Sequence, residues 1–232
     1  SRLGGTTSRP NYHMVFTGNP GTGKTTVARI IGRLFHELGI LDNPTVKEVD
    51  RSDLVGSWIG HTEKQTTRVL DEAMGGVLFV DEAYQLYKPE SPNDFGGDAI
   101  EALMTRLEND RGKFVAIFAG YTDEMEEFLG ANPGLRSRVP EGIEFPDYTP
   151  EEVGEMVALR LGDRWQYSRQ LVVDEAARRY AALPAVEQSN GRWARTFAER
   201  VESAQKDYVV TNKVTGPDMT RIPDALIVTL PD

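Results

Sequence analysis

A glycine-rich loop between an apolar run and an amphipathic run constrains this chain more than any other feature. Residues 18–25 read GNPGTGKT, which matches the phosphate-binding loop G-x-x-x-x-G-K-[ST] at every defined position. The apolar run at residues 12–17 (YHMVFT) predicts a buried strand before the loop, and apolar positions at helical spacing after Lys24 predict a helix behind it. A strand, a glycine turn and a helix in this order favour an α/β fold.

The composition of this loop predicts that it binds a nucleotide. Glycines let successive backbone N–H groups converge on phosphate oxygens, and the positive end of the following helix points at the same anion. Lys24 can reach the β- and γ-phosphates, and the Thr25 hydroxyl can coordinate Mg²⁺. The predicted nucleotide-binding residues of the loop are Gly18, Asn19, Pro20, Gly21, Thr22, Gly23, Lys24, Thr25 and Thr26.

Strand and helix patterns alternate from residue 12 to about residue 147. Beyond the first strand, apolar runs predict strands at 77–80 and 114–119, and two less apolar segments predict strands at 46–49 and 141–145. Helical patterns separate most of them, and such alternation implies right-handed crossovers. We therefore expect a parallel five-stranded sheet flanked by helices.

The pattern changes after Pro146. Residues 149–152 (TPEE) form a capping box with proline at the first helical position, and the chain beyond them is mostly helical. Residues 226–230 could be a strand or a loose end. The predicted organisation is a linker or frayed end, an α/β nucleotide-binding subdomain and a small helical lid, at residues 1–11, 12–147 and 148–232.

A second motif places two acids after a buried strand. Residues 77–82 read VLFVDE, and ligands of open parallel sheets sit at the edge where such strands end. Asp81 is predicted to hold Mg²⁺, directly or through water, and Glu82 to orient and polarise the attacking water. Because Glu82 supplies a base within the chain, the motif favours an ATPase over a GTPase switch. The predicted cofactors are therefore ATP and Mg²⁺.

Composition excludes several other classes of function. The chain has 232 residues with 26 Lys and Arg against 36 Asp and Glu, so its net charge of −10 disfavours a nucleic-acid partner. It has no cysteine, which excludes disulfides, thiol nucleophiles and zinc fingers. No apolar run approaches the roughly 20 residues of a membrane span, and no signal-peptide pattern opens the chain. We expect a cytoplasmic protein without a membrane partner.

Several stretches in order resemble one family. They read GNPGTGKTT, VGSWIGHTEKQT, GGVLFVDEAY and, from residue 114 to 148, FVAIFAGY…NPGLRSRV…IEFPDY. On these motifs the chain is identified as a member of the CbxX/CfxQ family of AAA+ ATPases, which includes red-type Rubisco activases, ATPase subunits of type VII secretion systems and sporulation-associated relatives. The resemblance implies an AAA+ fold, ATP hydrolysis and a chaperone-like, protein-remodelling ring of identical subunits, commonly a hexamer. It does not choose among client proteins.

The resemblance also assigns roles to two arginines. Arg138, in LRSRV, is similar to the arginine finger that a neighbouring subunit inserts toward the γ-phosphate, and Arg136 is the alternative. Arg192, in NGR, is similar to the sensor 2 arginine of the lid, and Arg195 is the alternative one turn away. The sensor 1 position falls near Tyr121 or Thr122, and the resemblance does not decide between them.

The remaining implied feature is a pore loop. Trp58, Ile59 and Gly60 stand where AAA+ unfoldases carry an aromatic–aliphatic–glycine loop, which grips an extended chain without sequence specificity. Residues 88–97 resemble a second pore-facing loop. The first functional hypothesis is therefore an ATP-driven motor that engages a client protein through its pore. The alternative is an ATP-dependent assembly module of a larger protein that does not thread its partner.

Overall fold

The computed structural model describes residues 10–56, 58, 60–88 and 94–231. The chain is divided into two compact units. The first, an α/β unit, holds residues 1–18 and 23–145, and the second, a helical unit, holds residues 19–22 and 146–232. Four residues of the glycine loop thus belong to the helical unit, which the sequence pattern did not indicate.

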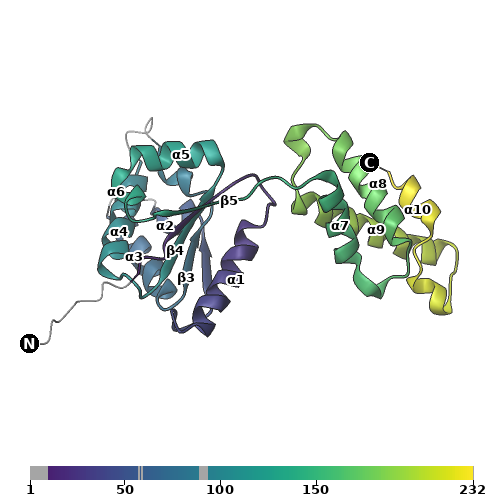
Figure 1. Cartoon of the computed structure of the whole chain (residues 1–232), viewed down its shortest axis with the longest axis horizontal. Helices are drawn as coiled ribbons and strands as arrows, with labels where there is room; N and C mark the ends of the chain where they lie inside the picture. Colours follow the sequence, from purple (N-terminus) through teal and green to yellow (C-terminus); the bar gives the residue numbers. More distant parts are fainter. Residues whose placement is uncertain (1–9, 57, 59, 89–93, 232) are drawn as a thin grey trace, which may run out of the picture. The chain divides into compact units, whose positions relative to one another are not determined.

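The α/β unit is built around a five-stranded sheet (Figure 1). Its strands are β1(Met14–Thr17), β2(Val46–Val49), β3(Val77–Val80), β4(Val115–Gly120) and β5(Glu141–Glu144). Its helices are α1(Lys24–Glu37), α2(Arg51–Leu54), α3(Thr62–Ala73), α4(Gly96–Asn109), α5(Thr122–Ala131) and α6(Pro133–Arg136), with a 3-10 helix η1(Ala83–Leu86). All pairings are parallel, in the order β2-β3-β4-β1-β5. The predicted parallel five-stranded sheet is confirmed.

Alternating residues of the strands supply two cores, one on each face of the sheet. Val15, Leu78 and Phe118 face a core that also receives α3, α4 and η1. Phe16 and Phe79 face the other core, where they meet α1. The alternation follows from the two-residue period of a strand, and burial on both faces explains why these runs are continuously apolar.

The apolar spacing after Lys24 predicted the helix α1, but it does not mark the buried face. Leu34 and Leu38 belong to this spacing, and their side chains are 50% and 64% exposed. Ala28 and Gly32 are the buried positions of α1, and a Cβ at Gly32 would lie 3.2 Å from a methyl group of Val46. Close packing through small residues therefore turns the larger leucines outward.

The helical unit has its own apolar core. Its helices are α7(Pro150–Leu161), α8(Arg169–Ala182), α9(Gly191–Thr211) and α10(Asp224–Thr229), with 3-10 helices η2(Gly162–Arg164), η3(Ala185–Glu187) and η4(Gly216–Thr220). The predicted capping box is present, because the Thr149 side chain accepts from the amide of Glu152 and the Glu152 carboxylate accepts from the amide of Thr149. Proline at the first helical position completes this start.

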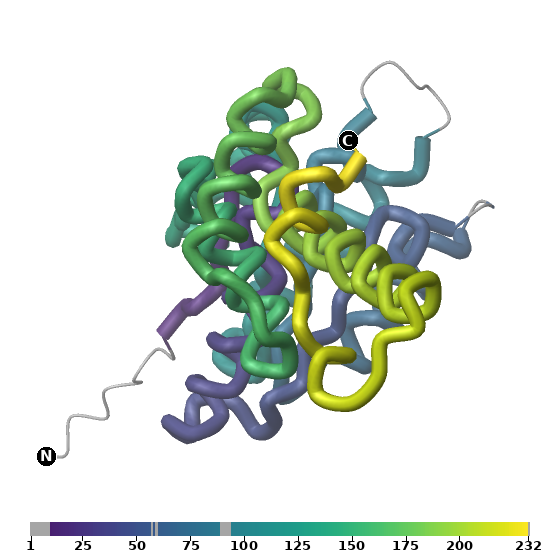
Figure 2. Tube along the Cα trace, turned by 90° about the vertical axis from the view of Figure 1, so that its right-hand side faces the viewer, coloured from purple at the N-terminus to yellow at the C-terminus, as the bar shows by residue number. Residues whose placement is uncertain are grey.

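The C-terminal segment is helical, so neither expectation for residues 226–230 was right. Figure 2 shows this segment in yellow, and the element it forms, α10, packs against α8 and α9. Ile227 and Leu230 are buried in the helical unit's core. Arg179 on α8 donates to the carbonyls of Val228 and Leu230, at 3.1 and 2.8 Å. These bonds satisfy carbonyls at the end of a helix too short to persist alone. Among the described residues, no helix is long and apolar enough to cross a membrane.

Candidate nucleotide-binding site

The glycine loop begins where β1 ends, and its backbone demands glycine. Gly18 has φ +139°, and a Cβ there would lie 2.2 Å from the carbonyl oxygen of Phe145. Gly23, with φ +101°, is the N-cap residue of α1, and it has no side chain that could cap the helix. The Lys24 Nζ donates to the carbonyl of Gly18 at 2.6 Å, which curls the lysine over the loop. A helix start beside a lysine suits an anion, and phosphate binding by this loop stays a prediction.

The central residues of the loop pack within the helical unit. Gly21 has φ +77°, and a Cβ there would meet the carbonyl oxygen of Ser189 at 2.2 Å and the amide nitrogen of Arg192 at 2.9 Å. The Gly191 amide donates to the carbonyl of Gly21 at 3.0 Å. The Tyr148 hydroxyl donates to the carbonyl of Thr22 at 3.1 Å. The carbonyls of Gly21 and Thr22 are thus satisfied by donors of the helical unit.

Asn190 organises this contact, and the sequence analysis did not single out its role. It is fully buried, with φ +54°, and its Nδ2 donates to Asp147 Oδ1 at 2.8 Å and to the carbonyl of Pro20 at 3.3 Å. Its Oδ1 accepts from the amide of Tyr148 at 2.9 Å. Asparagine tolerates positive φ better than most residues, and it immediately precedes α9. An asparagine directly before the Gly-Arg pair was the sequence signal for this position.

Arg192 and Arg195 both lie on the solvent side of α9. The backbone of Arg192 adjoins Gly21 within the helical unit, and both arginine side chains are exposed. Arg192 therefore stands in the same unit as residues 19–22 and close to them. Its role as sensor 2 stays a prediction.

The two acids follow β3, as predicted. In the sheet β4 separates β3 from β1, so the acidic motif and the glycine loop leave the same edge about 10 Å apart, twice the spacing between strands. The amide of Asp81 donates to the carbonyl of Val49 at 2.8 Å, and both acidic side chains are exposed. Both motifs therefore stand at the edge where ligands of open parallel sheets bind.

The backbone of Glu82 is unusual. It has φ +47° and ψ +45°, a left-handed conformation that costs a non-glycine residue of order 1 kcal/mol or more. Its amide donates to Asp81 Oδ1 at 3.1 Å, and its carboxylate accepts from the side-chain amide of Gln85. Strain of this kind gathers at functional sites, because the surrounding structure must hold the side chain in one place.

Tyr84 and Tyr121 lie beside the acids. Their ring centroids are 5.8 Å apart, and burial, together with the negative charge of Glu82, raises the pKa of Tyr84 to about 12. Tyr84 therefore keeps its proton at neutral pH. Tyr121 directly precedes α5, and Thr122 is the first residue of that helix. The choice between them for sensor 1 stays open.

The residues at this edge fit Mg²⁺ bound together with a nucleotide. Mg²⁺ prefers one or two protein oxygens plus phosphate oxygens and water, rather than a protein cage. Thr25, in the first turn of α1, and Asp81, after β3, supply oxygens of that kind. Within the residues that the structure describes, no three His, Cys, Asp or Glu side chains group as ligands for an ion. A cation shared with phosphates needs no such group.

The two finger candidates differ in their surroundings. Arg138 is 28% exposed, its Nη1 donates to the carbonyl of Gly134 at 2.8 Å, and its Nε lies 3.3 Å from Glu108 Oε2. Arg136, the last residue of α6, is exposed, and among the described residues no ion pair holds it. An arginine that reaches a neighbouring subunit must leave its intrachain partners first. Arg138 would have to break this ion pair, whereas Arg136 would not.

Trp58 is 72% exposed, an unusual state for the largest apolar side chain. The carbonyl of Trp58 accepts from the amide of His61 at 3.1 Å, and Gly60, two residues after Trp58, has φ +78°. The turn therefore presents the indole outward instead of burying it. Ile59 lies outside the described residues, as do residues 89–93 of the predicted second loop.

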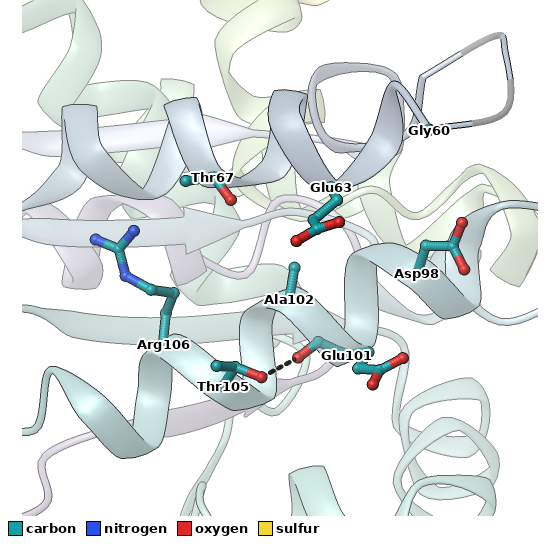
Figure 3. Close-up of a pocket in the computed structure, with 8 residues that line it drawn as sticks. All are labelled: Gly60, Glu63, Thr67, Asp98, Glu101, Ala102, Thr105 and Arg106. Atoms are coloured by element: carbon teal, nitrogen blue, oxygen red, sulfur yellow. Dashed lines mark hydrogen bonds between the residues drawn. The ribbon is translucent and has the colours of Figure 1, made fainter.

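A cleft of about 440 Å³ lies between α3 and α4, away from the nucleotide motifs. Figure 3 shows its lining, with carboxylates from both helices toward one end and Arg106 toward the other. The lining residues are Gly60, Glu63, Thr67, Asp98, Glu101, Ala102, Thr105 and Arg106. Because none of them belongs to the glycine loop or the acidic motif, the cleft is separate from the candidate nucleotide site.

Comparison with known proteins identifies the family. Residues 14–147 match the family model described as "ATPase family associated with various cellular activities (AAA)", which covers both nucleotide motifs. The chain is 45% identical over 218 residues to protein CbbX of Cereibacter sphaeroides, an alignment that spans 93% of this chain and 70% of the relative. The chain belongs to the AAA family of ATPases, in its CbbX/CfxQ group.

Other relatives of this AAA ATPase carry related names. It is 43% identical over 206 residues to protein CfxQ of Xanthobacter flavus, covering 88% of this chain and 65% of that protein. It is 53% identical over 152 residues to the chloroplastic ribulose bisphosphate carboxylase/oxygenase activase of Cyanidioschyzon merolae, covering 66% of this chain and 52% of that protein. The chain thus spans between about half and 70% of the length of these relatives.

Proposed function

We propose that this AAA ATPase is a protein-remodelling motor that works as a ring in the cytoplasm and grips a client protein through Trp58. The observation that carries the proposal is the exposed indole of Trp58, in the unit that also holds Lys24 and the two acids after β3. An exposed tryptophan outside both nucleotide motifs offers a large apolar grip to an extended chain. The similarity to CbbX and to the activase supports the same conclusion.

Within one subunit, four side chains divide the chemistry. Lys24 contacts the β- and γ-phosphates, while Thr25 and Asp81 hold Mg²⁺, which neutralises phosphate charge when bound. Glu82 accepts a proton from water as the water oxygen bonds to the γ-phosphorus. The bond from that phosphorus to the β–γ bridging oxygen breaks, and the products are ADP and phosphate.

The ring supplies the remaining groups. Arg138, or Arg136 in its place, reaches the γ-phosphate of a neighbouring subunit and stabilises the charge that develops there. Arg192 reports the nucleotide to the helical unit, a role favoured by its backbone contact with Gly21. We infer a homo-oligomer with the sixfold symmetry common in AAA+ proteins. The net charge of −10 supports a protein client over a nucleic acid.

The first client to test is ribulose bisphosphate carboxylase/oxygenase. The activase of Cyanidioschyzon merolae, whose name states that it acts on this enzyme, shares 53% identity across the aligned segment. The pore residues themselves are tolerant of sequence, so they do not select a client. Rubisco held inactive by a tight-binding sugar phosphate is therefore the direct assay substrate.

Two substitutions test the proposal together. Glu82→Gln should keep ATP binding and lose turnover, because the amide cannot accept the proton. Trp58→Ala should keep basal turnover and lose the reactivation of Rubisco. The matched control is Leu159→Ala, since Leu159 is 71% exposed on α7 of the other unit and should leave both activities intact.

Three results would count against this function. Turnover near wild type in Glu82→Gln would show that Glu82 is not the base. Full reactivation of Rubisco by Trp58→Ala would show that Trp58 does not grip the client. Basal hydrolysis without remodelling of any tested protein would favour the assembly module that does not thread its partner.

A further inference from the structure

Three successive carbonyls of the glycine loop, those of residues 20–22, accept hydrogen bonds from donors more than 120 positions away in the sequence. In loop order the donors are Asn190 Nδ2 at 3.3 Å, the Gly191 amide at 3.0 Å and the Tyr148 hydroxyl at 3.1 Å. The donors and residues 19–22 belong to the same helical unit. The helical unit therefore fixes the direction of these three carbonyls.

The same bonds set the direction of the loop amides. In a planar trans peptide, the carbonyl of one residue and the N–H of the next point in opposite directions. None of the described peptide bonds is cis. Because the carbonyls of residues 20–22 are turned toward the helical unit's donors, the amides of Gly21, Thr22 and Gly23 point away from those donors. Successive amides held in this way can bind one anion together.

The two side chains that donate to the loop belong to one hydrogen-bonded cluster. Asn190 Oδ1 accepts from the amide of Tyr148 at 2.9 Å, and Asn190 Nδ2 also donates to Asp147 Oδ1 at 2.8 Å. The other carboxylate oxygen of Asp147 accepts from Asn19 Nδ2 at 2.8 Å. The backbone amide of Asn190 donates to the Tyr180 hydroxyl at 3.0 Å. Both ends of the Asn190 side chain are therefore occupied, which fixes its orientation.

The cluster lies against the core of the helical unit. Asn190 and Tyr180 are 0% and 2% exposed, and the half-buried Tyr148 packs against the same core. Buried polar groups that have all their partners are costly to rearrange, because each lost bond would leave a group unsatisfied away from water. The cluster thus holds the backbone of residues 20–22 in one conformation.

We propose that Tyr148 and Asn190 are positioning residues for the nucleotide phosphates. They act through the backbone of residues 20–22, because the carbonyls they bind determine where the loop amides point. The helical unit then sets the affinity of the loop for ATP and for ADP alike, since such a loop binds phosphates that both nucleotides carry. The inference rests on the proposed function, because it takes the glycine loop as the phosphate site.

The test compares two tyrosine variants of the full chain. Tyr148→Phe removes the hydroxyl donor and keeps the ring. Tyr167→Phe is the matched control, because Tyr167 packs against the same core and its hydroxyl donates to the carbonyl of Ala158 on α7 at 2.8 Å, outside the loop. Titration with fluorescent analogues of ATP and ADP measures Kd, and thermal unfolding of each protein without nucleotide measures stability.

We expect Tyr148→Phe to raise the Kd for both nucleotides about fivefold, the effect of one lost hydrogen bond, while Tyr167→Phe leaves both values unchanged. The two variants should lose similar amounts of thermal stability, since each loses one hydroxyl–carbonyl bond. In steady-state hydrolysis, Tyr148→Phe should raise KM for ATP and keep kcat. Asn190→Asp, which places a carboxylate beside Asp147, should raise the Kd at least tenfold.

The possible outcomes separate this inference from the proposed function. Equal Kd values in Tyr148→Phe and Tyr167→Phe, with the wild type binding both nucleotides, overturn the inference alone. A raised Kd together with a much larger loss of thermal stability than in Tyr167→Phe assigns Tyr148 a structural role and also overturns it. A wild type that binds neither nucleotide overturns the inference and the proposed function together. Turnover of Glu82→Gln, measured alongside, tests the proposed function independently.

Discussion

The pH dependence of stability offers a test at His13. This histidine is 2% exposed, its Nδ1 accepts from the amide of Ala116 at 3.0 Å, and its ring lies 5.4 Å from that of Phe114. Burial, with a contribution from the positive charge of Arg111, lowers its pKa from 6.5 to about 4. The folded protein therefore keeps His13 neutral where an unfolded chain would protonate it.

The sign and size of the effect follow from proton linkage. Between pH 6.5 and pH 4 the unfolded state binds more protons at this site, so the free energy of unfolding falls as the pH falls. At 1.36 kcal/mol per pKa unit the full loss is about 3 kcal/mol, of which about 2 kcal/mol is reached at pH 5. Above pH 6.5 the contribution is fully present, and below pH 4 it does not change further.

Urea unfolding followed by circular dichroism at pH 8, 6.5 and 5 measures this loss. The control is His13→Gln, because glutamine does not titrate but can still accept from the Ala116 amide. Both proteins carry the same carboxylates, so the difference between the pH dependences of their free energies of unfolding isolates His13. Between pH 8 and pH 5 we expect the free energy of unfolding of the wild type to fall by about 2 kcal/mol more than that of the variant. The same pH dependence in both proteins would refute the reasoning.

Two further predictions concern the helical unit. Hydrogen bonds from Arg178 and Arg179 lower the pKa of Glu175 to about 2, against an ordinary 4.5. Above pH 4.5, Glu175→Gln should therefore reduce the free energy of unfolding of this unit by up to about 3 kcal/mol, and the difference should shrink as the pH falls toward 2. Urea unfolding at pH 7 and pH 3 checks this, and a constant difference would contradict it. Gly21→Ala should weaken ATP binding at least tenfold, or about 1.4 kcal/mol, because the new Cβ would collide with the carbonyl of Ser189 at 2.2 Å. Titration with a fluorescent ATP analogue measures the affinity, and Gly130→Ala, where no atom lies within 4 Å, should bind normally. Equal affinities for the two variants would show that the loop can rearrange.

Local patterns were enough to predict the elements that carry the nucleotide motifs. Continuous apolar runs predicted the buried strands because burial on both faces removes the need for alternation. The apolar pattern was a poor guide where tertiary packing decides which side chains are buried or which short segments become helical. Leu34 fits the apolar period of α1 but points outward, since the helix approaches the sheet through small residues. The last helix, α10, is held by Arg179 from a distant helix, and no local signal records such a contact.

The motifs predicted which residues form the site but not what holds them. The left-handed backbone of Glu82 and the contact from Gln85 depend on how the chain turns after β3. A glutamine three residues after the second acid was the available sequence signal for this contact. The role of Asn190 depends on residues 147 and 20, which the sequence places far apart. The spacing of residues in the sequence reveals the motifs, whereas the side chains that hold the motif residues in place are known only from the fold.

The central claim is that the active site is shared between subunits of a ring, and turnover per subunit as a function of protein concentration tests it most directly. Arg138→Ala and Arg136→Ala are measured alongside, with ATP binding as the check that each variant is folded. We predict that turnover rises steeply with concentration and that one of the two variants binds ATP without hydrolysing it. Turnover per subunit that is independent of concentration, with both variants fully active, would contradict the account.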